Sequence, residues 1–65
     1  MEIAPRITVE PGKRGGRPCV RGLRIAGADV LEMLGNRMTE AEILEDYPYL
    51  EAEDFPAVLL FAASW

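Results

Sequence analysis

Apolar side chains recur at helical spacing soon after the middle of the chain begins. Val30, Leu31 and Leu34 follow an i, i+1, i+4 pattern, which places them along one side of a helix. The pattern predicts a first helix over about residues 28–34. A glycine and Asn36 follow directly, and we expect Asn36 to take the left-handed conformation that ends this helix.

The second helix is predicted by its start signal. Thr39 and Glu42 have the spacing of a capping box, in which each side chain accepts a hydrogen bond from the other residue's backbone amide. Ile43 and Leu44 supply the apolar side, and the acidic residues around them are expected to face water. Pro48 stops the helix, because the residue before a proline avoids the α conformation.

The third helix is predicted over about residues 53–64 and is apolar nearly all round. Pro56 must lie in its first turn, since a later proline would clash with the preceding turn. One face is expected to carry Phe55, Val58, Leu59 and Ala62. The apolar residues outside that face are Leu60, Phe61 and Trp65. A domain this small cannot cover both sides, so we expect a second chain to pack here, with Phe61 and Trp65 as anchors and Phe55 and Leu60 beside them.

The first 26 residues have extended and turn character. Ile7 and Val9 alternate with a threonine, which favours a short strand, and a Pro-Gly pair closes it. Residues 12–18 are basic and rich in glycine and proline, which indicates an exposed loop. We therefore expect a single small domain, in which residues 1–26 form a β-hairpin and basic loop arm and residues 27–65 form a three-helix unit.

Length and cysteine content limit how such a domain can be stabilised. The chain has 65 residues, one cysteine and no histidine. An internal disulfide is excluded, and we expect no structural metal and no cofactor. Oligomerisation is the remaining support for a domain of this size, so we expect a homodimer or higher oligomer. The sequence shows neither a signal peptide nor a membrane span, and Cys19 reads as a small buried residue, which together favour a cytoplasmic protein.

Charge is divided between the two ends of the chain. Residues 1–37 hold seven basic side chains against four acidic ones, a net charge of +3, whereas residues 38–65 hold seven acidic side chains and no basic one. The basic end could contact phosphate groups. The alternative is that the two ends neutralise each other, within one subunit or between subunits.

Two runs of residues carry a resemblance to a known family. They are Gly16-Arg17-Pro18-Cys19-Val20-Arg21-Gly22-Leu23-Arg24-Ile25 and Met38-Thr39-Glu40-Ala41-Glu42-Ile43-Leu44-Glu45-Asp46-Tyr47-Pro48, with Arg6-Ile7-Thr8, Pro11-Gly12 and a closing helix that ends in Ala62-Ala63. With these the chain resembles, almost end to end, the small bacterial domain-of-unknown-function family numbered 433, of which several members are described as VapB-type antitoxins. The resemblance implies a mainly α, trihelical helix-turn-helix fold of winged-helix or homeodomain-like type with a short N-terminal β-hairpin. It also implies an antitoxin that holds a PIN-like ribonuclease toxin inactive and represses its own operon. Where the family usually has glycine between the first two helices, this chain has Arg37.

Two functional hypotheses follow, and they are compatible in an antitoxin. The first is a protein-interaction module that oligomerises through the third helix, with an acidic second helix that mimics nucleic acid towards a basic nuclease cleft. The second is a helix-turn-helix repressor that binds operator DNA without a toxin partner. The third helix has no side chain suited to reading bases, so DNA contacts would fall to Lys13, Arg14, Arg17, Arg21 and Arg24. We expect no enzyme activity, because the carboxylates lie on a solvated helical face.

Overall fold

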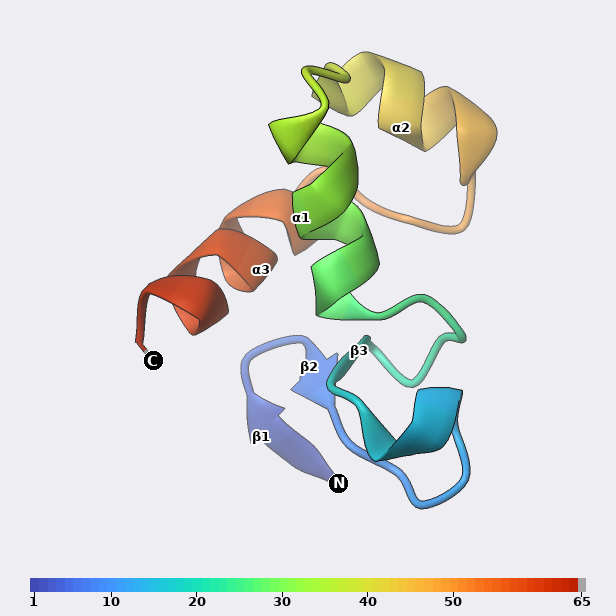
Figure 1. The fold of residues 1–65 in the computed structure, drawn as a ribbon, viewed down its shortest axis with the longest axis vertical. Helices are drawn as coiled ribbons and strands as arrows, with labels where there is room; N and C mark the ends of the chain where they lie inside the picture. The colour runs from blue at the N-terminus through green and yellow to red at the C-terminus, as the bar shows by residue number, and fades with distance from the viewer. Residues whose placement is uncertain (65) are drawn as a thin grey trace.

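A computed structural model describes residues 1–64 and confirms the mainly α fold class with an N-terminal β-hairpin. Trp65 lies outside the described residues. The elements are β1 (Glu2–Ala4), β2 (Ile7–Thr8), a 3-10 turn (Arg14–Gly16), β3 (Cys19–Val20), α1 (Gly27–Gly35), α2 (Glu40–Asp46) and α3 (Asp54–Ala63). Figure 1 shows the sheet at one end of the molecule, α2 at the other, and α1 and α3 between them.

The sheet is antiparallel, with the order β1-β2-β3, so the expected hairpin has a third strand. Ile7 pairs with Val20, and both side chains are fully buried, which explains why two such short strands hold their register. Cys19 is also buried, as the sequence predicts, and it forms a bridge to Ala26 just before α1 begins. The bridge therefore joins β3 to the residue directly before α1.

One hydrophobic core joins the sheet to all three helices. Its fully or almost fully buried members are Ile7, Val20, Ile25, Val30, Ile43, Leu50, Phe55 and Val58. Helix α3 packs against both α1 and β2, so it is the element that connects the helical part to the sheet. Burial of one side chain of this size stabilises a fold by roughly 1.5–3 kcal/mol, and the core is small enough for each to matter.

The capping box of α2 is confirmed. The Glu42 amide donates to Thr39 Oγ1 at 3.1 Å, and the Thr39 amide donates to Glu42 Oε1 at 2.8 Å. These bonds satisfy two backbone donors that the first turn of a helix leaves unpaired. Helix α2 ends at Asp46, two residues before Pro48, also as predicted.

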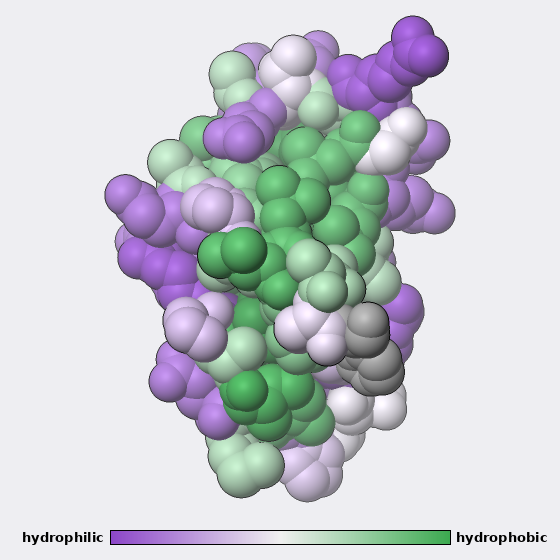
Figure 2. Space-filling model, turned by 90° about the vertical axis from the view of Figure 1, so that its left-hand side faces the viewer, coloured by the Kyte–Doolittle hydropathy of each residue, from purple (hydrophilic) through white to green (hydrophobic). Residues whose placement is uncertain are grey.

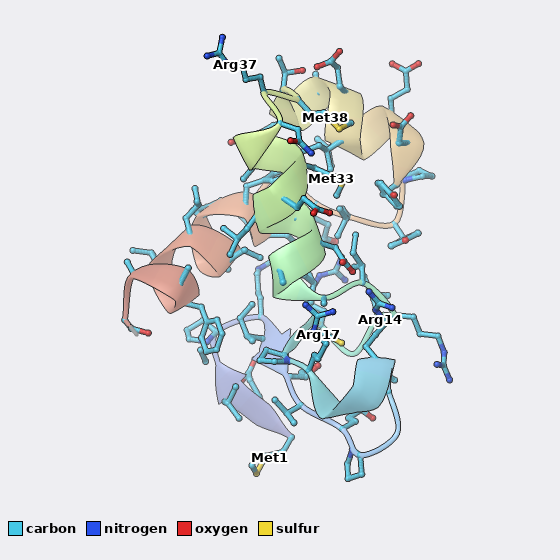
Figure 3. The ribbon with its side chains drawn as sticks, viewed as in Figure 1. Met1, Arg14, Arg17, Met33, Arg37 and Met38 are labelled. Atoms are coloured by element: carbon cyan, nitrogen blue, oxygen red, sulfur yellow. The ribbon has the colours of Figure 1, made fainter. Side chains whose placement is uncertain are left out.

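The turn between α1 and α2 corrects the expectation for Asn36. Asn36 has φ −84°, and the left-handed residue is Arg37, with φ 68°. The Met38 amide donates to the Met33 carbonyl at 3.1 Å, and the Arg37 amide donates to the Leu34 carbonyl at 3.0 Å. This pair of bonds is a Schellman motif, and it requires the left-handed conformation one position after Asn36. Figure 3 shows the Arg37 side chain pointing away from the domain.

Arg37→Gly should therefore stabilise the protein. Glycine adopts positive φ without the steric cost that a side chain adds, so we expect the free energy of unfolding to rise by about 0.5–1 kcal/mol, measured by urea denaturation. Arg37→Ala is the matched control, because it removes the same exposed side chain but keeps the Cβ. Equal stabilities of the two variants would contradict a backbone origin of the effect.

Candidate functional site

A buried carboxylate fixes the start of α3. Asp54 is only 1% exposed, although it carries a charge. Arg21 binds it in a fork, with Nε donating to Oδ1 at 3.0 Å and Nη2 donating to Oδ2 at 3.0 Å. Arg6 Nη1 donates to Oδ1 at 2.9 Å, and the Glu51 amide donates to Oδ2 at 2.8 Å. Every oxygen of this carboxylate is thus satisfied, which is the condition for burying a charge.

The two arginines come from unusual backbone positions on the sheet side. Arg6 has φ 64° and Arg21 has φ 46°, and the Arg21 amide donates to the Arg6 carbonyl at 2.9 Å. Arg21 Nη2 also donates to the Tyr49 carbonyl at 2.7 Å, in the segment between α2 and α3. Left-handed backbone costs energy for a residue with a side chain, and the ion pairs with Asp54 offset that cost. The cluster therefore ties the sheet, the α2–α3 segment and α3 together.

The pKa of Asp54 reflects these contacts. Burial alone would raise the pKa of its carboxyl group, but the hydrogen bonds from Arg21, from the Glu51 amide and from Arg6 outweigh burial and lower it. The same contacts raise the pKa of both guanidinium groups, for Arg6 mainly through Glu51 and then Asp54, and for Arg21 mainly through Asp54. The cluster is consequently charged at neutral pH, and its role is structural.

The side of α3 opposite these contacts is apolar and exposed. Leu60 is 71% exposed and Leu59 is 47% exposed. From Phe55 to Ser64 the sequence contains no charged residue. Figure 2 views the molecule from the α3 side and shows hydrophobic residues along the vertical centre of this face, interrupted by less hydrophobic ones, with polar residues on either side. We call the outward-facing residues Pro56, Leu59, Leu60 and Ala63 the α3 outer surface.

Some of the predicted interface residues are buried and others are exposed. Leu60 lies on the α3 outer surface, as expected. Phe55 does not, because it is fully buried in the domain's own core, and Leu59, predicted on the same face as Phe55 and Val58, is exposed. Phe61 is half-buried and packs against the core. Trp65 lies outside the described residues, so its predicted role as an anchor remains a prediction.

Hollows flank α3 along its length. Near its start, one of about 410 Å³ is lined by Glu40, Ala52, Glu53, Pro56 and Leu59. Near its end, one of about 300 Å³ between α1 and α3 is lined mainly by apolar side chains, including Leu31, Val58, Phe61 and Ala62, with Arg17 among its walls. The first hollow lies beside the α3 outer surface, whereas the second is on the side of α3 that faces α1.

The basic residues predicted to contact DNA also separate into two groups. Arg21 is held by Asp54, Lys13 Nζ donates to Glu10 Oε2 at 2.9 Å, and Arg14 Nη2 donates to Asp29 Oδ2 at 2.7 Å. Arg17 and Arg24 are exposed and form no ion pair within residues 1–64. Figure 3 shows Arg14 and Arg17 beside the start of α1. The two ends of the chain neutralise each other only through Arg6 and Arg21, which pair with Glu51 and Asp54, so that expectation holds in part, within one subunit.

Asp54 is the residue whose role the sequence did not reveal. Its sequence signal was weak, since it stands with Glu51 and Glu53 in an acidic segment that is typical of a solvated helix start. Among residues 1–64 there is no group of three or more side chains able to hold a metal ion. None of the helices in that part of the chain is long and apolar enough to cross a membrane.

These features define a class: a small mainly α domain with a three-stranded sheet and an exposed apolar helix. The model of the family described as "Protein of unknown function (DUF433)" matches residues 7–62, and the chain belongs to that family. A crystal structure of a DUF433 member protein from Anabaena variabilis ATCC 29413 is similar, with a TM-score of 0.85 and 29% sequence identity. The match covers 91% of this chain and 58% of the other, so this chain spans little more than half of that protein's length. The comparison with curated proteins gave no match.

Asp54→Asn should strongly destabilise the fold. The amide keeps the shape but loses the charge, and its NH2 group would face the donors of Arg21. We expect the free energy of unfolding at pH 7, measured by urea denaturation, to fall by roughly 2–4 kcal/mol. The expected loss is not larger, because both guanidinium groups remain partly solvated. Glu51→Gln is the control, with an expected loss under about 1 kcal/mol, since Glu51 is exposed. Equal losses would contradict the central role of Asp54.

The stability difference between wild type and Asp54→Asn should depend on pH. A lowered pKa means that the ionised carboxylate stabilises the folded state at any pH above its ordinary value, and that this contribution is lost as the pH falls further. The difference should be constant from neutral pH to about pH 4 and should shrink below it, in denaturation curves recorded at each pH. A difference that grew on acidification would contradict the assignment.

Proposed function

We propose that this protein is an antitoxin-like protein-interaction module, which associates through α3 and binds a PIN-like ribonuclease. The observation that carries the proposal is the α3 outer surface: two exposed leucines on a ten-residue helix that has no charged residue after Asp54. Exposed apolar side chains that occur singly need no explanation, but a continuous apolar helix face is typical of an interface.

The acidic side of the molecule supports the choice of a nuclease as partner. Glu40, Glu42, Glu45 and Asp46 are all exposed on α2, and none of them pairs with a cation in the part of the chain that the structure describes. A cleft that binds RNA is lined by positive charge, and an acidic helix is electrostatically complementary to it. The resemblance to antitoxins supports the same partner.

Operator binding is supported by fewer residues. Three of the five basic side chains considered for DNA already donate to carboxylates of the same chain, which leaves Arg17 and Arg24. Two cations per chain give a small electrostatic contribution, so DNA binding would need a multimer. We therefore place it second, as an autoregulatory activity of the assembled antitoxin.

The test is inhibition of a PIN-like ribonuclease encoded beside this chain. The wild-type protein should suppress cleavage of an RNA substrate when it is added at equimolar concentration. Glu45→Lys should weaken inhibition at least tenfold, because a like-charge contact costs binding energy. Glu32→Lys on α1 makes the same charge change outside α2 and should leave inhibition unchanged. Unchanged cleavage at excess wild-type protein would contradict the antitoxin proposal.

A further inference from the structure

We infer that the hollow between α1 and α3 binds a small carboxylic acid with an apolar body, and that Arg17 pairs with its carboxylate. We call this space the α1–α3 hollow. Its walls are residues 17–18, residues 26–28 and Leu31 on one side, and Val58, Phe61 and Ala62 of α3 on the other. It lies on the side of α3 that faces α1, away from the α3 outer surface, so the inference goes beyond the proposed function and does not depend on it.

The α1–α3 hollow has a buried apolar floor and a partly open rim. Ala26 is 0% exposed and Val58 is 1% exposed. Leu31, Phe61 and Ala62, which also line it, are half-buried. An apolar group that enters the hollow therefore removes both its own surface and that of the rim from water. A volume of about 300 Å³ is at the lower end of the range for small-molecule sites, so the ligand is small, with a body such as one aromatic ring.

Gly27 keeps the hollow open, although the fold itself does not require a glycine there. It is not among the glycines with positive φ, so its backbone accepts a side chain. A Cβ at this position would lie 3.8 Å from Val58 Cγ1 and 4.0 Å from the Pro18 carbonyl oxygen, which are ordinary van der Waals contacts. Alanine would fit and would also favour the helix. The effect of the glycine is to leave this space for another group.

Arg17 gives the hollow one available positive charge. Its side chain is exposed and pairs with no acid among residues 1–64, and Figure 3 shows it beside the start of α1. Asp29, the acid in the first turn of α1, is already bound: its Oδ2 accepts from Arg14 Nη2 at 2.7 Å and from the Ala26 amide at 3.0 Å. None of the described residues that line the hollow is acidic. A carboxylate at its rim would therefore meet a cation whose donors are free.

This combination of an apolar floor and a single cation defines the class of ligand. A guanidinium group binds a carboxylate through two parallel hydrogen bonds, and one such group balances one negative charge. A polynucleotide would need several cations, and a polar ligand body would find no hydrogen-bonding side chain on the floor. Because Arg17 is exposed, its ion pair should add a modest part of the affinity, and the apolar body should supply the rest.

Titration of the full chain with phenylpropionate, followed by the amide chemical shifts in NMR spectra, tests the inference. The shifts should saturate with a dissociation constant of about 1 mM or below and should be largest at Gly27, Ala28 and Ala62. Phenylpropanamide has the same apolar body without the charge, and it should bind about three- to tenfold more weakly. The midpoint of thermal unfolding should rise with the phenylpropionate concentration, because the ligand binds only the folded chain.

Three variants test the roles of the two residues. Arg17→Gln should weaken phenylpropionate binding about three- to tenfold and leave phenylpropanamide binding unchanged. Arg24→Gln is the matched control, since Arg24 is also exposed and unpaired among residues 1–64 but does not line the hollow. It should change neither affinity. Gly27→Ala narrows the hollow and should weaken the binding of both compounds at least threefold, while circular dichroism stays helical.

Several outcomes would overturn the inference. They are shifts that do not saturate, equal affinities for the two compounds, and shifts that are largest at Leu59 and Leu60 instead of the hollow. Shifts at Gly27 and Ala62 that follow the protein concentration without any ligand would show that a second copy covers the hollow, and would overturn it too. None of these results bears on ribonuclease inhibition, which is tested through α2.

Discussion

The fold depends on one buried carboxylate. Asp54 accepts hydrogen bonds from two guanidinium groups that belong to the sheet side and from a backbone amide just ahead of α3. The hydrophobic core joins strands of two or three residues to three short helices. Apolar contacts are not directional, so the hydrogen bonds to Asp54 help to define how these elements dock. Removing such a charge costs more than removing an exposed one, because its partners lose the contact for which they were placed.

This constraint has a consequence for the surface. The bonds to Asp54, together with Phe55 and Val58 in the core, determine which side of α3 faces inwards. Leu60 must then face outwards, because it lies about 140° from Phe55 and about 160° from Val58 around the helix. Leu59 lies at the edge of the inward side and is 47% exposed. The exposed apolar surface is thus not a loosely packed end of the chain. It belongs to a helix whose rotation is fixed from the other side.

The sequence predicted the elements better than the contacts between them. Thr39 and Glu42 carry a local signal, and the capping box is present with both hydrogen bonds. Pro56 likewise located the first turn of α3. Asn36 was wrong by one position, because residue preferences favoured asparagine whereas the hydrogen bonds of the α1 terminus require the left-handed residue at Arg37. Phe55 was predicted at the partner interface but is buried, and Leu59, predicted on the same face as Phe55 and Val58, is exposed. An almost uniformly apolar helix has no periodicity that identifies its inward side. The pairing of Arg6 and Arg21 with Asp54 spans 48 and 33 positions, and no local pattern reports such a contact.

The arginines with a left-handed backbone have structural roles, whereas the other arginines are unpaired among the described residues. Among the described residues other than glycine, positive φ occurs at Arg6, Arg14, Arg21 and Arg37. The first three each donate to a carboxylate across the fold, and those bonds offset the cost of the left-handed backbone. Arg37 instead serves the Schellman turn through its backbone. Arg17 and Arg24 have neither role: their backbone is not left-handed, and no acid within residues 1–64 pairs with them. The basic segment, continuous in the sequence, therefore contains two groups of side chains: Lys13, Arg14 and Arg21 are bound to carboxylates of the same chain, whereas Arg17 and Arg24 are exposed and pair with no acid among residues 1–64.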